Sequence, residues 1–232
     1  MSVLFVTGTG TDVGKTVVTA AVAAAAGGSV AVLKAAQTGV ADGEAGDADT
    51  VARLARVTAR DLARFPEPLA PATAARRAGA PPVRPKAVAD AAAALAEEHD
   101  LVLVEGAGGL LVRFDDEGGT LADAAAQLSA PVLVVAHPGL GALNAAALTA
   151  EALRARGLRC AGLVLGSWPV RPDLAMRCNV TDLPEVTGAP LLGALPEGAG
   201  RADPAAFRDI ARAGLAPELG GTFDADEFAR GR

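Results

Sequence analysis

The amino-acid sequence predicts one doubly wound α/β domain, with a mainly parallel sheet and helices on both of its faces. Short apolar runs recur along the chain, and each is followed by an alanine-rich stretch of helical character. The runs are nearly continuous in Val, Leu and Ala, which is typical of strands buried on both faces. We expect this domain to span residues 1–220, followed by a polar, flexible tail at 221–232.

The expected strands and helices largely alternate along the chain. Strands are expected at residues 3–6, 30–33, 101–104, 132–136, 161–165 and 190–195. Helices are expected at residues 15–26, 50–56, 85–98, 121–128, 143–156 and 204–213. Region 37–84 is the longest without an expected strand, and the prolines of its segment 65–71 exclude a central strand and predict an ordered loop.

Composition and charge exclude several classes of protein. Aromatic residues are only 3% of the chain and tyrosine is absent, so the core must be built from Val, Leu and Ala. A net charge of −6 gives no electrostatic footprint for nucleic acid or for an anionic membrane. Two cysteines make no disulfide framework, and the first apolar run is too short for a signal peptide or a membrane span. We expect a soluble cytoplasmic protein.

The strongest functional signal is a Gly-rich loop between the first expected strand and the first expected helix. Residues 7–16 read TGTGTDVGKT. In this context the backbone N–H groups at the helix start hold phosphate oxygens, Lys15 contacts the outer phosphates, and the Thr16 hydroxyl is a ligand of Mg²⁺. A Gly- and Thr-rich turn with an incidental lysine is the alternative, which the strand–loop–helix context disfavours. The sequence therefore predicts that this chain binds a nucleoside triphosphate with Mg²⁺.

One position of the loop departs from the strict phosphate-loop pattern. The G-x-x-x-x-G-K-T pattern requires glycine at residue 9, where this chain has Thr9 between Gly8 and Gly10. The loop is thus a variant that is longer by one residue if it is counted from Gly8. The residues expected around the phosphates are Asp12, Val13, Gly14, Lys15, Thr16 and Val17.

Further segments give the chain a resemblance to dethiobiotin synthetase, an enzyme family of the biotin pathway. Besides the phosphate loop, these segments are KAAQTG at 34–39, VEGAGG at 104–109, GLGALN at 139–144 and PLLGALP at 190–196. They occur in the order of that family and extend over roughly residues 3–198. The phosphate loop alone is shared by many families, whereas K-x-x-x-T-G together with E-G-A-G-G is much more specific.

The resemblance implies a homodimeric P-loop enzyme with a seven-stranded parallel sheet. It also implies an ATP- and Mg²⁺-dependent ligase that converts 7,8-diaminononanoate, CO₂ and ATP into dethiobiotin, ADP and phosphate. In that reaction one substrate amine captures CO₂ as a carbamate, ATP phosphorylates the carbamate, and the second amine closes the ureido ring.

Lys34 ends the second expected strand, at the edge of the sheet where ligands of α/β proteins bind. A carbamate and a γ-phosphate are both anionic, so Lys34 and Lys15 are the expected catalytic residues that supply fixed positive charge. The alternative is a lysine that packs its stem on the sheet edge and keeps its head in water; the resemblance favours the functional role. Thr38 and Thr11 are the expected contacts of the reacting end of the substrate.

Two carboxylates are expected near the Mg²⁺ ion. Glu105 ends an apolar strand, which resembles the metal-holding strand of P-loop enzymes, although it could also be a solvated charge. The resemblance places a second carboxylate just before the helix expected at 50–56, where either Asp47 or Asp49 could instead cap that helix. We prefer Asp47 as the metal-linked residue. After Glu105, the small residues Gly106, Ala107 and Gly108 would let the backbone approach the nucleotide or the substrate.

The segment at 139–144 precedes the helix expected at 143–156. The resemblance implies that Gly141 and Asn144, at this helix start, bind the far carboxylate of a substrate held by the neighbouring subunit. From the residues alone, an ordinary helix start is the simpler interpretation.

The expected base pocket departs from the family pattern. The family commonly has an Asn-containing pair after the fifth strand, whereas this chain has Gly166 and Ser167. Asparagine can pair with a purine edge as donor and acceptor, which glycine and one hydroxyl cannot do. The backbone at Pro196, Glu197 and Gly198 would then contact the base. We expect weak selectivity for ATP, so that other nucleoside triphosphates are accepted. We expect Gly166→Asn to increase the preference for ATP if its amide can reach the base.

Two other functions are compatible with a phosphate loop on this fold. One is a further amide-forming P-loop ligase, although such relatives often carry a glutamine-hydrolysing domain for which this chain has no Cys/His pair. The other is a partitioning or targeting ATPase, which carries an additional lysine early in the loop that residues 8–13 lack.

Overall fold

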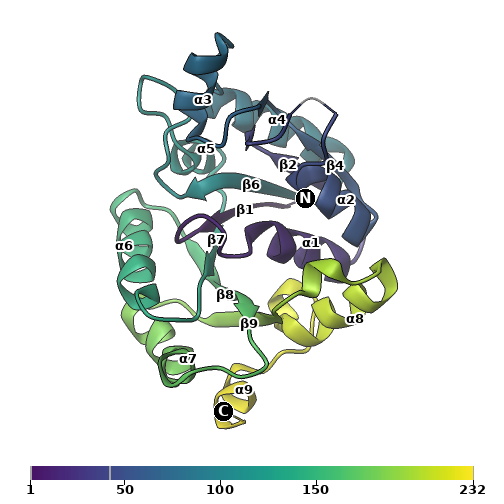
Figure 1. Ribbon diagram of the computed structural model, residues 1–232, viewed down its shortest axis with the longest axis vertical. Helices are drawn as coiled ribbons and strands as arrows, with labels where there is room; N and C mark the ends of the chain where they lie inside the picture. Colours follow the sequence, from purple (N-terminus) through teal and green to yellow (C-terminus); the bar gives the residue numbers. More distant parts are fainter. Residues whose placement is uncertain (1, 42, 232) are drawn as a thin grey trace.

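The apolar runs form the strands of a seven-stranded sheet in the computed structural model, which describes residues 2–41 and 43–231 (Figure 1). From one edge to the other, the strands are β4 (Thr58–Asp61), β2 (Val30–Lys34), β6 (Leu101–Gly109), β1 (Ser2–Gly8), β7 (Val132–Ala136), β8 (Cys160–Trp168) and β9 (Leu191–Pro196). All neighbouring strands are parallel. The prediction of a single doubly wound α/β domain is confirmed.

The strands at the centre of the sheet are covered on both faces. Every residue of β2 and of β7 is buried, which explains why their sequences are continuous in apolar residues instead of alternating. The helices that cover them contribute many alanines, such as Ala20 and Ala21 on one face and Ala122 and Ala125 on the other, all fully buried. These small side chains let helices approach the sheet closely, so the core needs few aromatic residues.

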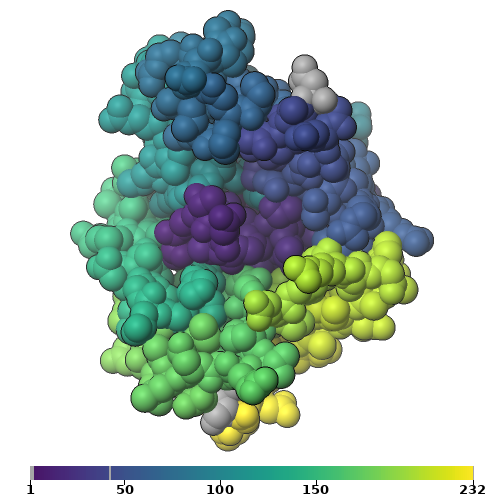
Figure 2. Space-filling view, viewed as in Figure 1, coloured from purple at the N-terminus to yellow at the C-terminus, as the bar shows by residue number. Residues whose placement is uncertain are grey.

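The helices lie in two layers. One face carries α1 (Lys15–Ala25), α2 (Asp47–Ala55) and α8 (Pro204–Gly214), which pack on one another at the right of Figure 1. The other face carries α4 (Pro85–Glu98), α5 (Leu121–Gln127), α6 (Ala142–Ala155) and α7 (Leu174–Thr187). In the space-filling view the phosphate loop, in purple, lies near the middle of the visible face, between these layers (Figure 2).

The prediction that residues 37–84 contain no strand is wrong. This region holds the edge strand β4, a two-stranded sheet of β3 (Gln37–Thr38) and β5 (Arg64–Phe65), and the helix α3 (Pro71–Ala78). The side chains of β4 alternate between exposed and half-buried because the strand lies at the sheet edge. Its sequence TARD therefore lacks the apolar run by which the central strands are recognised.

The C-terminal part of the chain also differs from the expectation. Helix α7 contains Pro184 and was not predicted. After β9 the chain forms the 3-10 helix η1 (Ala199–Arg201), helix α8 and the 3-10 helix η2 (Pro217–Leu219). The residues that follow were expected to form a polar tail, but they include helix α9 (Ala225–Arg230). Phe223 is buried, and the ring centroids of Phe228 and Trp168 are 5.1 Å apart. The contacts of these two aromatic side chains place the segment against the domain.

The sheet order determines where the polar strand ends meet. Strand β6 lies between β1 and β2, so the C-terminal ends of these three strands are neighbours at one edge of the sheet. In this register Glu105 of β6 pairs with Val6 of β1 on one side and with Lys34 of β2 on the other. The phosphate loop that follows β1 is thereby placed beside both charged residues.

Within residues 2–41 and 43–231, no helix combines the length and apolar character needed to cross a membrane.

Candidate functional site

The phosphate loop joins the end of β1 to the first turn of α1. Asp12, with φ 57°, and Gly14, with φ 93°, are left-handed, a backbone conformation from which anion-binding nests are built. Thr9 is not among the non-glycine residues with positive φ in the described part of the chain, and its N–H donates to the Val135 carbonyl at 2.9 Å. A side chain is therefore tolerated at residue 9, where the strict pattern requires glycine.

Lys15 is buried at the start of α1 and is directed back into the phosphate loop. Its Nζ donates to the Gly10 carbonyl oxygen at 2.8 Å. Burial and, after it, the positive charge of Lys34 lower the pKa of Lys15, and nearby carboxylates only partly oppose this. An anion bound in the loop would offset both effects, so the electrostatics of this lysine favour a phosphate ligand.

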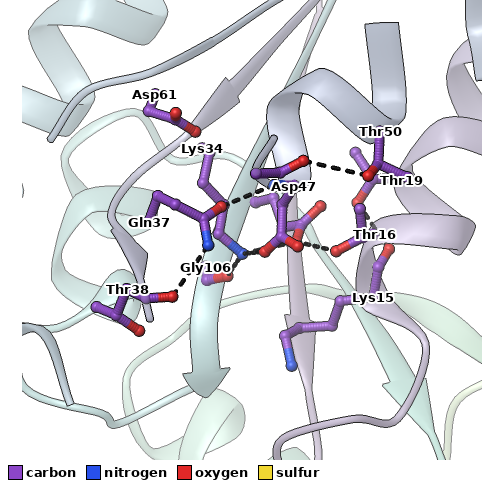
Figure 3. Close-up of polar contacts among 12 residues, drawn as sticks. Lys15, Thr16, Thr19, Lys34, Gln37, Thr38, Asp47, Thr50, Asp61 and Gly106 are labelled. Carbon is purple, nitrogen blue, oxygen red and sulfur yellow. Dashed lines mark hydrogen bonds and ion pairs between the residues drawn. The ribbon is translucent and has the colours of Figure 1, made fainter. Parts of the chain in front are cut away.

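Lys34 is the centre of a buried cluster of charges (Figure 3). Its Nζ lies 2.7 Å from Glu105 Oε1 and 2.6 Å from Asp47 Oδ2, and it donates to the Gly106 carbonyl at 3.0 Å. Burial opposes the charge of Lys34, but the carboxylates of Glu105 and Asp47 outweigh it and raise the pKa of the lysine. Lys34 is thus a charged, desolvated ammonium group with a fixed position and not a lysine with its head in water.

The same carboxylate of Glu105 connects β6 to the phosphate loop. Thr16 Oγ1 donates to Glu105 Oε1 at 2.9 Å, so one oxygen of this fully buried residue contacts both Thr16 and Lys34. The hydroxyl of Thr16 and the carboxylates of Glu105 and Asp47 are hard oxygen donors of the kind that Mg²⁺ takes. The described residues hold no cluster of three or more His, Cys, Asp or Glu that suits a metal.

The two candidate aspartates before α2 have different surroundings. Asp47 is the one that contacts Lys34 and lines the cavity beside the phosphate loop. Asp49 Oδ2 instead accepts from the Gly46 N–H at 2.7 Å and from the Arg64 guanidinium at 3.1 Å, and these two bonds lower the pKa of Asp49. Asp49 therefore caps the helix start, and Asp47 is left facing the site.

Gln37 contributes to the site but was not singled out by the sequence. Its buried amide Oε1 accepts from the Asp47 N–H at 2.8 Å, and its Nε2 donates to the Thr38 carbonyl at 3.1 Å (Figure 3). The side chain thus links the turn that carries Asp47 to the strand that carries Thr38. The one available signal was its position between Lys34 and Thr38 in the K-x-x-x-T-G segment.

Most of the expected site residues line one cavity of about 430 Å³. Its lining consists of Thr11, Asp12, Gly14, Lys15, Thr16, Val17, Lys34, Ala36, Gln37, Thr38, Asp47, Ala107 and Gly108. Other expected residues do not line it: Val13, Glu105, Gly106, Gly141, Asn144, Gly166, Ser167, Pro196, Glu197 and Gly198. Of these, Glu105 and Gly106 reach the cavity through their contacts with Lys34, whereas Gly141 and Asn144 lie exposed at the start of α6.

Gly166 has a structural role that the sequence did not reveal. A Cβ atom at this residue would lie 2.0 Å from the Val13 carbonyl oxygen and 2.8 Å from Val135 Cγ1. The end of β8 therefore touches the phosphate loop directly, and no side chain fits between them. An asparagine here would have to displace the loop, so this geometry removes the basis for expecting Gly166→Asn to add selectivity for adenine. Ser167, the next residue, is half-buried.

Comparison with known proteins gives one consistent result. A family model described as an AAA domain matches residues 2–204. The ATP-dependent dethiobiotin synthetase BioD of Saccharopolyspora erythraea is 80% identical over 222 residues, which cover 95% of this chain and 98% of that protein. The protein of the same name from Streptomyces avermitilis is 70% identical and covers 99% of this chain and 98% of its own length.

Among solved structures, the MinC:MinD cell division protein complex of Aquifex aeolicus contains a chain that superposes with a TM-score of 0.59. The match covers 97% of this chain and 98% of that chain, at 17% sequence identity. Identity this low shows a shared fold and nothing about a shared activity.

The buried charge cluster makes a prediction about stability. Lys34→Met leaves Glu105 desolvated without its cation, so we expect the free energy of unfolding to fall by about 3 kcal/mol, measured by urea denaturation. Because the pKa of Lys34 is raised, its contribution is fully present below the lysine pKa of the unfolded chain, about 10.4, and is lost only as the pH rises through the higher folded value. Measurement at pH 7 therefore registers all of it.

The matched control for this prediction is Lys86→Met. Lys86 forms an ion pair with Asp90 at 2.7 Å, but the side chains are 74% and 64% exposed. We expect a change within about 0.5 kcal/mol. Equal effects of the two substitutions would contradict the stabilising role of the buried cluster.

Proposed function

Because this chain belongs to the dethiobiotin synthetase family and is an ATP-dependent ligase, we propose that it makes dethiobiotin from 7,8-diaminononanoate, CO₂ and ATP. One observation carries the assignment to this site: the buried ammonium of Lys34 lies beside Glu105 and Asp47, and only strand β6 separates its strand from the one that leads into the phosphate loop. This arrangement offers fixed positive charge where two anions must meet.

The proposed reaction has three steps. An amine nitrogen of the substrate attacks the carbon of CO₂ and loses a proton, which gives a carbamate. A carbamate oxygen then attacks the γ-phosphorus of ATP and ADP leaves. Finally the second amine attacks the carbamoyl carbon, phosphate leaves, and the ureido ring is closed. The carbamate and the triphosphate are both anionic and would repel each other without nearby cations. We therefore assign Lys15 to the phosphates and Lys34 to the carbamate and the γ-phosphate.

The remaining cavity residues receive roles from their positions. We propose that backbone N–H groups of residues 12–17 hold the phosphates and that Thr16, Asp47 and Glu105 hold Mg²⁺, which neutralises charge on the transferred phosphoryl group. Thr11 and Thr38 line the same cavity and are assigned to the reacting end of the substrate. The backbone at 106–108 would border the nucleotide or the substrate.

The far end of the substrate requires a partner in this proposal. Gly141 and Asn144 lie outside the cavity, at the exposed N-terminus of α6. Beside them, the side chains of Leu140 and Leu148 are 88% and 58% exposed. We propose that a second copy of this chain covers these leucines and brings its own α6 start to the substrate carboxylate, which makes the active form a homodimer.

The two other functions that the phosphate loop allowed have less support. The likeness to a cell division ATPase complex concerns the fold alone, at 17% identity, whereas the relatives at 70–80% identity are ligases by name. An ATP-consuming biosynthetic ligase also fits the cytoplasmic location expected from the sequence, which remains part of the proposal.

Product formation tests the proposed activity directly. The purified chain, supplied with diaminononanoate, bicarbonate, ATP and Mg²⁺, should form dethiobiotin that mass spectrometry detects, with one ADP per product. Lys15→Ala should lower kcat/KM by roughly 100-fold or more, because the β,γ-phosphates lose their main protein cation. ATP hydrolysis without dethiobiotin would exclude the proposed reaction, and near-normal turnover of Lys15→Ala would exclude the phosphate-loop assignment.

The two aspartates form a matched pair for a test of the metal site. Asp47→Asn should raise the Mg²⁺ concentration needed for half-maximal nucleotide binding by roughly 10-fold, since an amide is a weaker ligand than a carboxylate. Asp49→Asn should leave this titration unchanged and cost about 1 kcal/mol of stability through the weakened helix cap. If the metal titration of Asp47→Asn matches that of the unchanged chain, Asp47 does not hold Mg²⁺.

Weak discrimination between nucleotides is the third expected outcome. Phosphate contacts do not sense the base, and discrimination needs polar groups that the wrong base leaves unpaired. We expect CTP, GTP and UTP to support turnover with kcat/KM within roughly 100-fold of ATP, a difference of about 2.7 kcal/mol. Ser167→Asn should increase the preference for ATP, because residue 167 is half-buried and already carries a side chain, whereas residue 166 can carry none. A preference for ATP beyond about a thousand-fold would mean that other groups recognise adenine.

A further inference from the structure

We propose that Arg53 is a positioning residue for the nucleoside, because its guanidinium group fixes the loop at 197–202 beside the phosphate site. Arg53 Nη2 donates to the Gly200 carbonyl at 2.7 Å, and Nη1 donates to the Ala202 carbonyl at 3.4 Å. The loop contains η1 and connects β9 to α8, whereas Arg53 belongs to α2 on the same face of the sheet. This inference rests on the nucleotide site proposed above.

The loop at 197–202 borders the path along which the nucleoside must leave the phosphate loop. Val17, in the first turn of α1, lines the phosphate cavity, and a Cβ atom at Gly200 would lie only 3.1 Å from Val17 Cγ2. The Glu197 N–H donates to the Trp168 carbonyl at 2.8 Å, which joins the loop to the end of β8. Since β8 itself touches the phosphate loop at Gly166, a base that extends from the phosphates passes between Ser167 and this loop.

The guanidinium contact also connects the loop to the charged end of the cavity. Helix α2 begins at Asp47, whose carboxylate contacts Lys34, and Arg53 lies six residues later on the same helix, roughly 9 Å along its axis. Figure 2 shows the yellow-green atoms of the last third of the chain against the blue atoms of this region at the right of the molecule. Helix α2 thus carries the carboxylate of Asp47 at its start, and near its end Arg53 holds the loop at 197–202.

A surface hydrogen bond with no functional role is the competing explanation. Arg53 is exposed, and such a bond would contribute modestly to stability and nothing specific to binding. The two explanations differ in one measurable respect. A positioning residue for the nucleoside affects ligands that carry a base, whereas a purely structural contact does not distinguish them from a bare chain of phosphates.

The test compares ATP with inorganic tripolyphosphate, each titrated calorimetrically with Mg²⁺ in the absence of diaminononanoate. Arg53→Met keeps an unbranched apolar stem and removes the guanidinium donors; we expect it to weaken ATP binding roughly 10-fold and tripolyphosphate binding less than 2-fold. Arg53→Lys, which keeps one donor group, should fall between Arg53→Met and the unchanged chain. Arg60→Met, at an exposed arginine of the edge strand β4, is the matched control and should change neither affinity.

The outcomes separate this inference from the function on which it rests. If the unchanged chain binds ATP and tripolyphosphate but Arg53→Met weakens both equally, or neither, the role of Arg53 is overturned while the phosphate site stands. If the unchanged chain does not bind tripolyphosphate, the phosphate site fails and the role of Arg53 fails with it. Thermal unfolding of each variant, recorded alongside, should shift by no more than a few degrees.

Discussion

The ion pair between Lys34 and Glu105 is the constraint on which the rest of the site depends. Both residues are almost completely buried, and a desolvated charge is tolerated only when a close partner and further hydrogen bonds compensate it. The parallel register of β2 and β6 sets the two residues directly opposite each other, so the pair is a property of the sheet and not of a loop. Thr16 and Asp47 are attached to this pair, one through Glu105 and the other through Lys34.

This arrangement prepares the cavity for anions before any ligand arrives. Lys34 is kept charged by its carboxylate neighbours, while Lys15, which is buried and repelled by Lys34, has a lowered pKa. The negative charge of a bound triphosphate would offset the repulsion that Lys34 exerts on Lys15. The triphosphate would also find the charged ammonium group of Lys34 already in place. Preorganised charge of this kind costs little reorganisation during phosphoryl transfer, and the sheet supplies the rigidity that it needs.

The sequence predicted the positions of functional residues well where these residues directly follow a continuous apolar run, and less well elsewhere. Lys34 ends β2, the phosphate loop follows β1, and Glu105 directly follows the apolar residues of β6, so their shared edge of the sheet was predictable. The roles of Asp47 and Asp49 depend on the position at which α2 begins, which spacing does not give to within two residues. Strand β4 at the sheet edge and helix α7 with its internal proline lack the usual patterns, and the contact of Gly166 with the phosphate loop joins residues far apart in the chain.

The contact at Gly166 links the geometry of the phosphate site to its selectivity. Because β8 must touch Val13 and Gly14 to support the phosphate loop, residue 166 can carry no side chain, and the first residue of the expected base-reading pair is lost to packing. In the nucleotide site that we propose, recognition of the base would then rest on Ser167 and on the backbone of the loop at 197–202. A single hydroxyl can donate or accept, so it accommodates several bases, and backbone groups recognise a base only if their loop is held still. Selectivity in this chain would then depend less on which side chain faces the base than on how firmly Arg53 and the end of β8 hold that loop.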